Sequence, residues 1–278
     1  PDHVSHWREI PHLPIAGFRQ AAIRTFDAAE TVATFFTSGT TGSARGAHHF
    51  RTLELYRAAS MAGFRRAFGA QKRPVTSLIP TVDHAPDSSL SQMVTWVLEE
   101  LHDPDSDAAP LLLGTAFGLA DHFEREPELR LAPNTTIMET GGFKGRRRDL
   151  ERSDLHELYH RAVVPSEQVL GEYGMTELSS QWYDGLDNRA AEPVDRRVYR
   201  SPAWARVRLL DPVTLEDVPV GHVGLVALTD PINVGSVSSI LTADLGERVI
   251  DERGLDGFVY RGRATGAAIR GCSLRDET

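Results

Sequence analysis

Residues 31–46, TVATFFTSGTTGSARG, join a run of β-branched and aromatic residues to a segment rich in glycines and hydroxyl groups. The first seven residues are typical of a buried strand that stops at Ser38 and Gly39. Apolar residues between positions 49 and 68 then recur at the spacing of an amphipathic helix. The sequence therefore places the glycine-rich segment between a strand and a helix.

The same alternation continues along the chain. Strand-like runs cover residues 75–79, 111–114 and 135–139, and residues 168–170 open another strand that runs into GEYG. Helix-like runs cover residues 90–101, 117–123 and 153–162. Ser88 or Ser89 is a candidate N-cap for the first of these helices, and Ser153 for the last. This order predicts an α/β fold, in which flanking helices cover a layered and mostly parallel sheet.

The pattern changes after about residue 201, where short strand-like runs alternate with turns (205–210, 223–230, 239–249 and 257–263). We expect an α/β core at residues 1–200, a smaller β-rich subdomain at 201–263 and a hinge-like tail at 264–278.

Composition limits the classes of function. The net charge of −9 argues against nucleic acid as a partner, because phosphate contacts need a basic face. Apolar residues make up 41% of the chain, and no run reaches the roughly 18 apolar residues of a membrane span. The chain begins at Pro1, which is consistent with processing, and carries no signal-peptide pattern. With Cys272 as its one cysteine, we expect a cytoplasmic protein without an internal disulfide.

The chemistry of residues 37–46 is that of a phosphate site. Glycines allow the backbone to turn tightly, and the exposed N–H groups and hydroxyls can then surround a phosphate. Arg45 adds a positive charge. The segment lacks the Gly-Lys-Ser/Thr of a Walker A loop. A hydroxyl-rich surface turn is the alternative, which the flanking strand and helix disfavour.

TSGTTGSARG at residues 37–46 resembles the signature phosphate loop of the adenylate-forming superfamily, which includes acyl-CoA and aryl-CoA ligases, nonribosomal-peptide adenylation domains and luciferases. Three more blocks are similar to those of the family and follow in the family's order: GEYGMTE (171–177), LTADLGE (241–247) and YRGR (260–263). Within the superfamily, the sequence most resembles the LuxE-type acyl-protein synthetases, through the segments GTTGSARGAHHF, ETGGFKGRRR and IRGCSL. The phenylacetate-CoA ligases are the neighbouring branch.

The resemblance implies an enzyme that uses ATP and Mg²⁺, releases AMP, and in some branches takes CoA. It assigns the β- and γ-phosphates to six residues of the loop: Thr37, Ser38, Gly39, Thr40, Thr41 and Gly42. Tyr173 would pack on adenine, Gly174 would adjoin the nucleotide, and Thr176 would contact the α-phosphate. Glu177 would ligate Mg²⁺, whose preferred ligands are carboxylate and phosphate oxygens.

Further roles implied by the resemblance concern the ribose and the acid. Asp244 would accept hydrogen bonds from the ribose hydroxyls, and Arg263 would reach the ribose or phosphates. Gly141 and Gly142 would lie against adenine or the acyl group. Two histidines and one glycine are the candidate substrate contacts: His48, His49 and Gly171.

Plainer interpretations stay open for several of these residues. The two histidines could cap the next helix, Glu177 could cap or salt-bridge at a helix start, and Tyr173 could be part of the core. Asp244 could be an ordinary turn aspartate. Lys144 and the arginines at 146–148 are usually a solvated face, and could instead contact an acidic carrier protein.

The acyl acceptor also has alternatives. Acyl-protein synthetases pass the acyl group to a cysteine near their C-terminus, which would be Cys272 here, with Arg270 and Arg275 available to lower its pKa. A buried small residue is the plainer interpretation. CoA, an acyl-carrier protein or a reductase would be the other partners of the acyl group.

Two features depart from the family pattern. The family carries a small C-terminal domain with an invariant lysine, whereas the sequence ends at Thr278 and its last lysine is Lys144. The proline-lysine usual in the loop is replaced by Ala44 and Arg45. We therefore expect that domain to be absent, and a nucleotide-binding subunit without chemistry of its own stays the alternative from another class.

Overall fold

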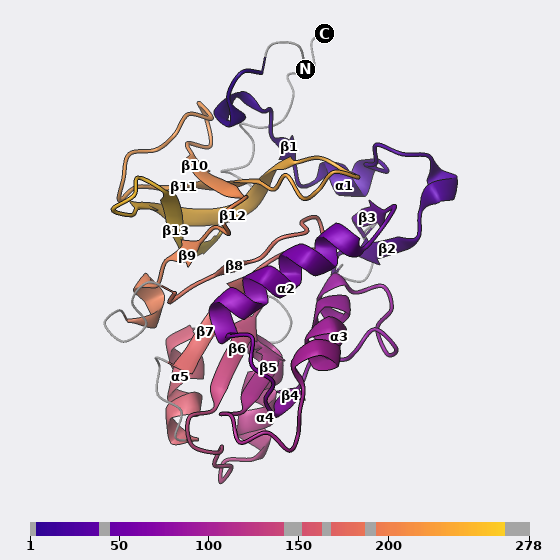
Figure 1. The fold of residues 1–278 in the computed structure, drawn as a ribbon. Coiled ribbons are helices and arrows are strands. Elements are labelled where there is room, and N and C mark those ends of the chain that lie inside the picture. Colours follow the sequence, from indigo (N-terminus) through magenta and orange to yellow (C-terminus); the bar gives the residue numbers. More distant parts are fainter. Residues whose placement is uncertain (1–3, 39–44, 142–151, 163–167, 187–192, 265–278) are drawn as a thin grey trace. The chain divides into compact units, whose positions relative to one another are not determined.

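The computed structural model describes residues 4–38, 45–141, 152–162, 168–186 and 193–264. The chain divides into two compact units, each described here by itself. The strand-rich unit comprises Pro1–Thr52 and Arg200–Thr278, and the α/β unit comprises Leu53–Tyr199. Figure 1 gives the element labels.

The α/β unit is built on a sheet in the order β8-β7-β6-β5-β4. Its strands are β4 (Val75–Ser77), β5 (Leu111–Thr115), β6 (Thr136–Thr140), β7 (Val169–Tyr173) and β8 (Trp182–Tyr183). Neighbouring strands from β4 to β7 pair in parallel, and β8 pairs antiparallel with β7. The predicted α/β fold with a mostly parallel sheet is confirmed.

Helices alternate with these strands along the chain (Figure 1). They are α2 (Glu54–Phe68), α3 (Ser89–Leu101), α4 (Ala116–Arg125) and α5 (Arg152–Arg161), with the 3-10 turn η4 at Val194–Arg196. Leu112, Ile137 and Val169 of successive strands pack with α4 and α5 in one apolar cluster. Because side chains alternate along a strand, the residue that follows each of these three faces the side of the sheet opposite α4 and α5.

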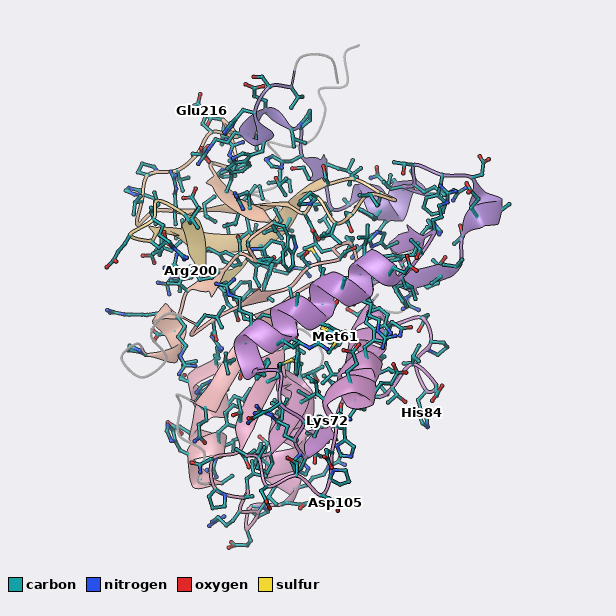
Figure 2. The ribbon with its side chains drawn as sticks, viewed as in Figure 1. Met61, Lys72, His84, Asp105, Arg200 and Glu216 are labelled. Carbon is teal, nitrogen blue, oxygen red and sulfur yellow. The ribbon has the colours of Figure 1, made fainter. Side chains whose placement is uncertain are left out.

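Caps and burial explain the boundaries of these helices. The Ser88 side chain accepts a hydrogen bond from the N–H of Ser91, so this predicted N-cap of α3 is confirmed. Ser153 lies within α5, so its predicted role as the N-cap is wrong. In α2, Met61 is buried, whereas Lys72 and Asp105 lie in exposed connections between elements (Figure 2).

The strand-rich unit is built on four antiparallel strands in sequence order: β10 (Arg206–Leu210), β11 (Val223–Thr229), β12 (Ser239–Ile250) and β13 (Asp256–Arg263). Leu210, Leu225, Ala227 and Leu241 form an apolar cluster within it. The predicted β-rich region after residue 201 is confirmed. β9 (Tyr199–Arg200) lies where the chain passes between the units.

Residues 1–52 cluster with these C-terminal strands, although the sequence grouped them with the α/β core. β1 (Leu13–Pro14) pairs in parallel with Ile240 and Leu241 of β12, at positions where β13 does not pair. The other N-terminal elements are η1 (Trp7–Glu9), α1 (Gly17–Gln20), η2 (Ala28–Glu30), β2 (Ala33–Phe36) and β3 (Ala47–Phe50).

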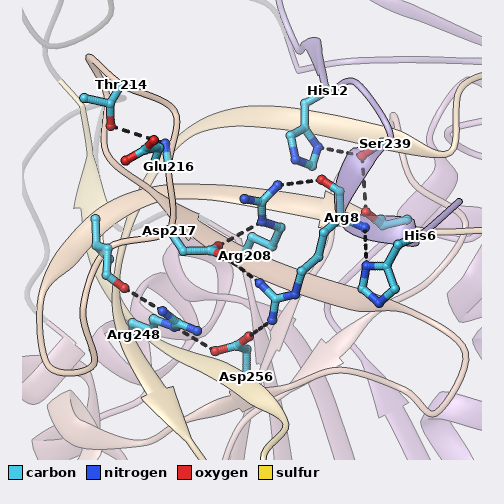
Figure 3. A network of polar contacts seen from close by, with 12 residues as sticks. His6, Arg8, His12, Arg208, Thr214, Glu216, Asp217, Ser239, Arg248 and Asp256 are labelled. Atoms are coloured by element: carbon cyan, nitrogen blue, oxygen red, sulfur yellow. Dashed lines mark hydrogen bonds and ion pairs between the residues drawn. The ribbon is translucent and has the colours of Figure 1, made fainter. Parts of the chain in front are cut away.

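An ion-pair network fastens the N-terminal residues to this sheet (Figure 3). The Arg8 guanidinium lies 2.6 Å from Asp217 and 3.2 Å from Asp256. The backbone carbonyl of Arg8 accepts a hydrogen bond from the Arg208 side chain. Arg208 also pairs with Asp217, and Arg248 pairs with Asp256, each at 2.8 Å. These long-range pairs explain why the N-terminal segment belongs to the strand-rich unit.

Candidate functional site

The glycine-rich loop connects two strands, so the predicted helix directly after it is wrong at its beginning. Residues 47–50 pair antiparallel with residues 33–36, and α2 begins only at Glu54. The short run AHHF alternates between half-buried and buried side chains, as a strand does. The loop is therefore the connection of a β-hairpin.

Thr37 and Arg45 close the base of this hairpin loop. The N–H of Thr37 donates to the Gly46 carbonyl, and the N–H of Gly46 donates to the Thr37 hydroxyl, both at 2.9 Å. The Arg45 side chain donates to the carbonyls of Thr37 and Phe36. Ser38 is exposed. Gly39, Thr40, Thr41 and Gly42, which complete the predicted phosphate contacts, lie outside the described residues.

The two histidines after the loop have different surroundings. His48 is 1% exposed, and its ring packs 4.2 Å from Phe50 and 5.9 Å from Phe18, between ring centroids. His49 is half-buried, with Nδ1 3.0 Å from the Thr34 hydroxyl, and burial lowers its pKa. Neither histidine caps α2, because both lie in β3 and the N-cap of α2 is Leu53. Their predicted contact with the acid stays a prediction.

In the α/β unit, the predicted residues gather at one edge of the sheet. β6 and β7 pair in parallel with Glu139 opposite Gly171 and Thr140 opposite Glu172. Gly141 and residues 173–177 therefore lie at or just beyond the carboxyl ends of two neighbouring strands. In open α/β sheets, ligands bind outside this edge. Within this unit, GEYGMTE and Gly141 thus lie at the edge where a ligand is expected.

Gly141 follows β6 and has a left-handed backbone conformation. Its φ of +88° lies in the left-handed region that favours glycine, and a Cβ built there meets no described atom within 4 Å. The room beside Gly141 fits its predicted place against a ligand. Gly142 lies outside the described residues.

Tyr173 is the last residue of β7, and Gly174 follows it. Tyr173 is 9% exposed, and its ring centroid lies 5.8 Å from that of Tyr199 in a tilted arrangement. Gly174 is exposed, and a Cβ there would meet the Glu172 carboxylate. A larger residue at position 174 would therefore displace Glu172.

Thr176 and Glu177 lie in the turn that follows. The Leu178 N–H donates to the Met175 carbonyl at 3.1 Å, which closes the turn. Thr176 is half-buried, and Glu177 is 5% exposed. Between β7 and β8, where every residue is described, no helix begins or ends, so the alternative in which Glu177 caps a helix is wrong. A buried carboxylate at the carboxyl edge of a parallel sheet is suited to a cation that also binds a ligand's phosphates.

Gly171, a candidate substrate contact, is enclosed by protein on its Cβ side. A Cβ there would lie 2.5 Å from Arg152, 2.6 Å from the Tyr199 hydroxyl and 2.9 Å from Asp184. The chain's own polar side chains fill this space. A substrate role for Gly171 would have to come from its backbone, and it stays a prediction.

Glu172 is a buried carboxylate of β7 that sequence reasoning gave no role, although it lies inside GEYGMTE. It is 6% exposed, and the Thr140 hydroxyl donates a hydrogen bond to its carboxylate. Burial raises its pKa to about 7, while the hydrogen bond from Thr140 acts in the opposite direction. Burial is the main cause that raises the pKa of the Tyr183 and Tyr56 hydroxyls, and the nearby Glu172 carboxylate raises both further.

Asp244 and Arg263 form the second pair of predicted residues, in the strand-rich unit. They are register partners on β12 and β13, and Arg263 Nε lies 3.2 Å from Asp244 Oδ1. The Thr242 hydroxyl accepts from the N–H of Asp244 at 3.1 Å. Asp244 lies within β12, so the alternative of a turn aspartate is wrong. Cys272, Lys144 and the arginines at 146–148 lie outside the described residues.

Within the described part of the chain, no three His, Cys, Asp or Glu residues are grouped as metal ligands.

Among the described residues, no helix has the length and apolar character that crossing a membrane requires.

Comparison with solved structures shows the fold that this chain shares. ATP-bound MatB from Rhodopseudomonas palustris superposes with a TM-score of 0.59 at 19% identity, covering 86% of this chain and 49% of MatB. A 2-hydroxyisobutyryl-CoA ligase in complex with R3-HIB-AMP gives 0.65 at 15% identity, covering 91% and 58%. O-succinylbenzoate coenzyme A synthetase from Bacillus subtilis, in complex with ATP and magnesium, gives 0.56 at 16%, covering 86% and 51%.

No family model matches the sequence, and no curated protein matches it. The chain spans about half to three fifths of the length of these solved proteins. At 15–19% identity, the likeness establishes a common fold with CoA ligases.

Proposed function

We propose that this chain uses ATP to activate a carboxylic acid as an acyl-adenylate and then takes part in passing the acyl group to a thiol. The observation that carries the proposal is the position of Gly141 and residues 173–177 after neighbouring parallel strands, at the ligand-binding edge of the sheet. The likeness to structures containing ATP or an acyl-AMP supports it.

The proposed reaction has two steps. A carboxylate oxygen of the acid attacks the α-phosphorus of ATP, and the bond from that phosphorus to pyrophosphate breaks. A thiolate then attacks the acyl carbon of the adenylate, and AMP leaves. The first step needs no protein nucleophile, so the chain's contribution to it is to position the reactants and neutralise charge.

Each predicted contact serves that positioning. Tyr173 and Gly141 would flank the base, and Thr176 would donate its hydroxyl hydrogen to an α-phosphate oxygen. Asp244 would accept hydrogen bonds from the ribose hydroxyls, held in place by its ion pair with Arg263. The loop at residues 37–42 would hold the β- and γ-phosphates through N–H groups and hydroxyls.

The donor set fits Mg²⁺. Mg²⁺ in nucleotide sites is usually held by one or two carboxylates together with substrate phosphates and water. The buried Glu177, in the turn after β7, is such a carboxylate. When bound, Mg²⁺ would supply neutralisation of phosphate charge.

CoA is the acceptor favoured by the solved structures, two of which are a CoA ligase and a CoA synthetase by name. The sequence blocks favour Cys272 instead, by their likeness to LuxE-type acyl-protein synthetases, or an acyl-carrier protein or reductase as partner. A phenylacetate-type CoA ligase is the second candidate. A free cysteine acceptor also accords with the predicted cytoplasmic location, where thiols stay reduced.

Acid-dependent exchange of labelled pyrophosphate into ATP tests the first step. With a panel of fatty, hydroxy, amino and aromatic acids, we expect exchange with at least one class. Glu177→Gln should abolish it, whereas the exposed Glu157→Gln of α5 should leave it unchanged. ATP binding without exchange for any acid would contradict the proposal and favour a nucleotide-binding subunit.

The second step is tested with the acid that gives exchange. CoA-dependent release of AMP would identify a CoA ligase. An acyl adduct on the intact chain, lost in Cys272→Ser, would identify an acyl-protein synthetase. Exchange with neither result would point to a separate carrier protein.

A further inference from the structure

One arginine connects the two strands that lead into the candidate site. Arg152, in the first turn of α5, forms ion pairs with Glu139 of β6 and with Asp184, which follows β8. The distance from Arg152 Nη2 to Asp184 Oδ2 is 2.6 Å, and Arg152 also donates to the Val194 carbonyl at 3.2 Å. A guanidinium offers several donors in a rigid plane, so it can hold two carboxylates at once.

Each carboxylate is fixed to the end of one strand. Glu139 lies in β6, two residues before Gly141, which follows the strand. Asp184 is tied to Gly171, two residues before Tyr173: its carboxylate accepts from the Gly171 N–H at 2.7 Å, and its N–H donates to the Gly171 carbonyl at 3.0 Å. The guanidinium therefore bridges the carboxyl ends of β6 and β7 on the α5 side of the sheet.

The bridge is buried and closely packed. The side chains of Glu139 and Asp184 are 2% and 0% exposed, and that of Arg152 is 14% exposed. The Tyr159 hydroxyl donates to Glu139 at 3.2 Å. Burial acts to lower the pKa of Arg152, but the carboxylates of Asp184 and Glu139 raise it well above its usual value. The two carboxylates thus stabilise the charged form of Arg152.

Burying charges in this way is a poor route to stability. The desolvation cost of a buried ion pair often offsets its Coulombic gain, so apolar residues would stabilise such a position equally well. What the network supplies instead is a fixed distance between two strand ends. That is the requirement of a site whose contacts come from both strands.

We propose that Arg152 is a positioning residue, which holds the ends of β6 and β7 so that Gly141 and residues 173–177 together meet the nucleotide. The proposal rests on the adenylation proposed above. Arg152 itself would touch neither nucleotide nor acid, because it acts through Glu139 and Asp184.

Arg152→Lys is the informative variant, with Arg248→Lys as a matched control. Lysine keeps the charge but loses the planar fork that reaches both carboxylates. The Arg248 side chain is also 14% exposed and also combines a carboxylate with a carbonyl, Asp256 at 2.8 Å and Val218 at 2.7 Å (Figure 3). It belongs to the strand-rich unit, and neither Asp256 nor Val218 is a proposed site residue.

Two measurements separate positioning from simple stability. Hydrogen exchange should become faster in peptides covering residues 136–141 and 169–178 of Arg152→Lys, but not in a peptide covering β5. The kcat of pyrophosphate exchange should fall about 10- to 100-fold, as expected when reacting groups are displaced by about 1 Å. Arg248→Lys should change kcat only through its folded fraction. Glu139→Gln, a milder variant, should reproduce both effects if Arg152→Lys does not fold.

Failure of this inference differs from failure of the adenylation proposal. Unchanged hydrogen exchange at both strand ends, or an equal loss of kcat in the two lysine variants, would overturn the positioning role. Absence of pyrophosphate exchange by the unaltered chain would instead refute adenylation. In that case, the hydrogen-exchange comparison alone would decide whether Arg152 fixes the two strand ends.

Discussion

Asp244 and Arg263 face each other across β12 and β13, and the Arg263 Nε atom lies 3.2 Å from Asp244 Oδ1. The carboxylate is largely buried, whereas 64% of the Arg263 side chain is exposed. The pair therefore presents an oriented acceptor beside a solvent-accessible cation, which suits the hydroxyls of a ribose.

Replacing Asp244 by Ala should raise the KM for ATP about 10-fold or more, because a hydrogen bond to a charged group contributes about 1.5–3 kcal/mol. Glu247→Ala is the matched control: Glu247 pairs with Arg261 on the same two strands, at a more exposed position. Steady-state exchange kinetics of the two variants test this. Equal effects on KM would remove Asp244 from the nucleotide site.

Gly141→Ala tests the open space at the end of β6. A non-glycine residue at φ +88° costs about 1–2 kcal/mol, so the free energy of unfolding should fall by that amount. Gly254→Ala is a control with φ +75° and equally open surroundings. Both variants should lose similar stability, but only Gly141→Ala should lose ATP affinity, measured by calorimetry. Unchanged affinity would mean that no ligand fills the space beside Gly141.

Stability should depend on pH through Glu172. Its folded pKa of about 7 lies above that of the unfolded chain, so the folded state retains a proton that the unfolded state releases. Stability should therefore fall as pH rises from about 4.5 to 7, by about 3 kcal/mol in total. Urea unfolding of the unaltered chain and Glu172→Gln at pH 5, 6, 7 and 8 gives this contribution as a difference. A difference that is constant over these pH values would contradict the account.

His156 should act in the opposite direction. It is 4% exposed, and burial, together with the nearby Arg152, lowers its pKa to about 3. Below pH 6.5, His156 is protonated in the unfolded chain but stays neutral in the folded state until the pH falls to about 3. The contribution of His156 to stability therefore rises with pH between about 3 and 6.5. The contribution at pH 5 should be about 2 kcal/mol less favourable than at pH 7. His156→Leu should flatten this part of the stability profile, whereas an unchanged slope would show that another group is responsible.

The sequence predicted the α/β alternation well because each strand and helix has its own periodicity, as in residues 90–101 and 111–114. It misassigned residues 49 and 50 to a helix, since a four-residue run such as AHHF fits either period. It also could not place residues 1–52, because pairing of Leu13 with Ile240 joins positions far apart in the chain. Such long-range pairing leaves no local pattern.

The candidate site was predicted only where residues form contiguous blocks. Tyr173 and Glu177 lie within GEYGMTE, and Asp244 within LTADLGE. The bridge from Arg152 to Glu139 and Asp184 has no such block, and its members matter only because β6 and β7 are neighbours. Glu172 was visible in the sequence, but its raised pKa depends on burial, which the block alone does not reveal.

The most direct test of adenylation follows the oxygen atoms of the acid. With both carboxylate oxygens labelled with ¹⁸O, attack on the α-phosphorus places one labelled oxygen in the acyl-adenylate bridge. Attack of a thiol on the acyl carbon then leaves that oxygen in AMP. The account predicts one ¹⁸O atom in each AMP released, measured by mass spectrometry with the acid that supports exchange. Label in inorganic phosphate, or unlabelled AMP, would contradict it.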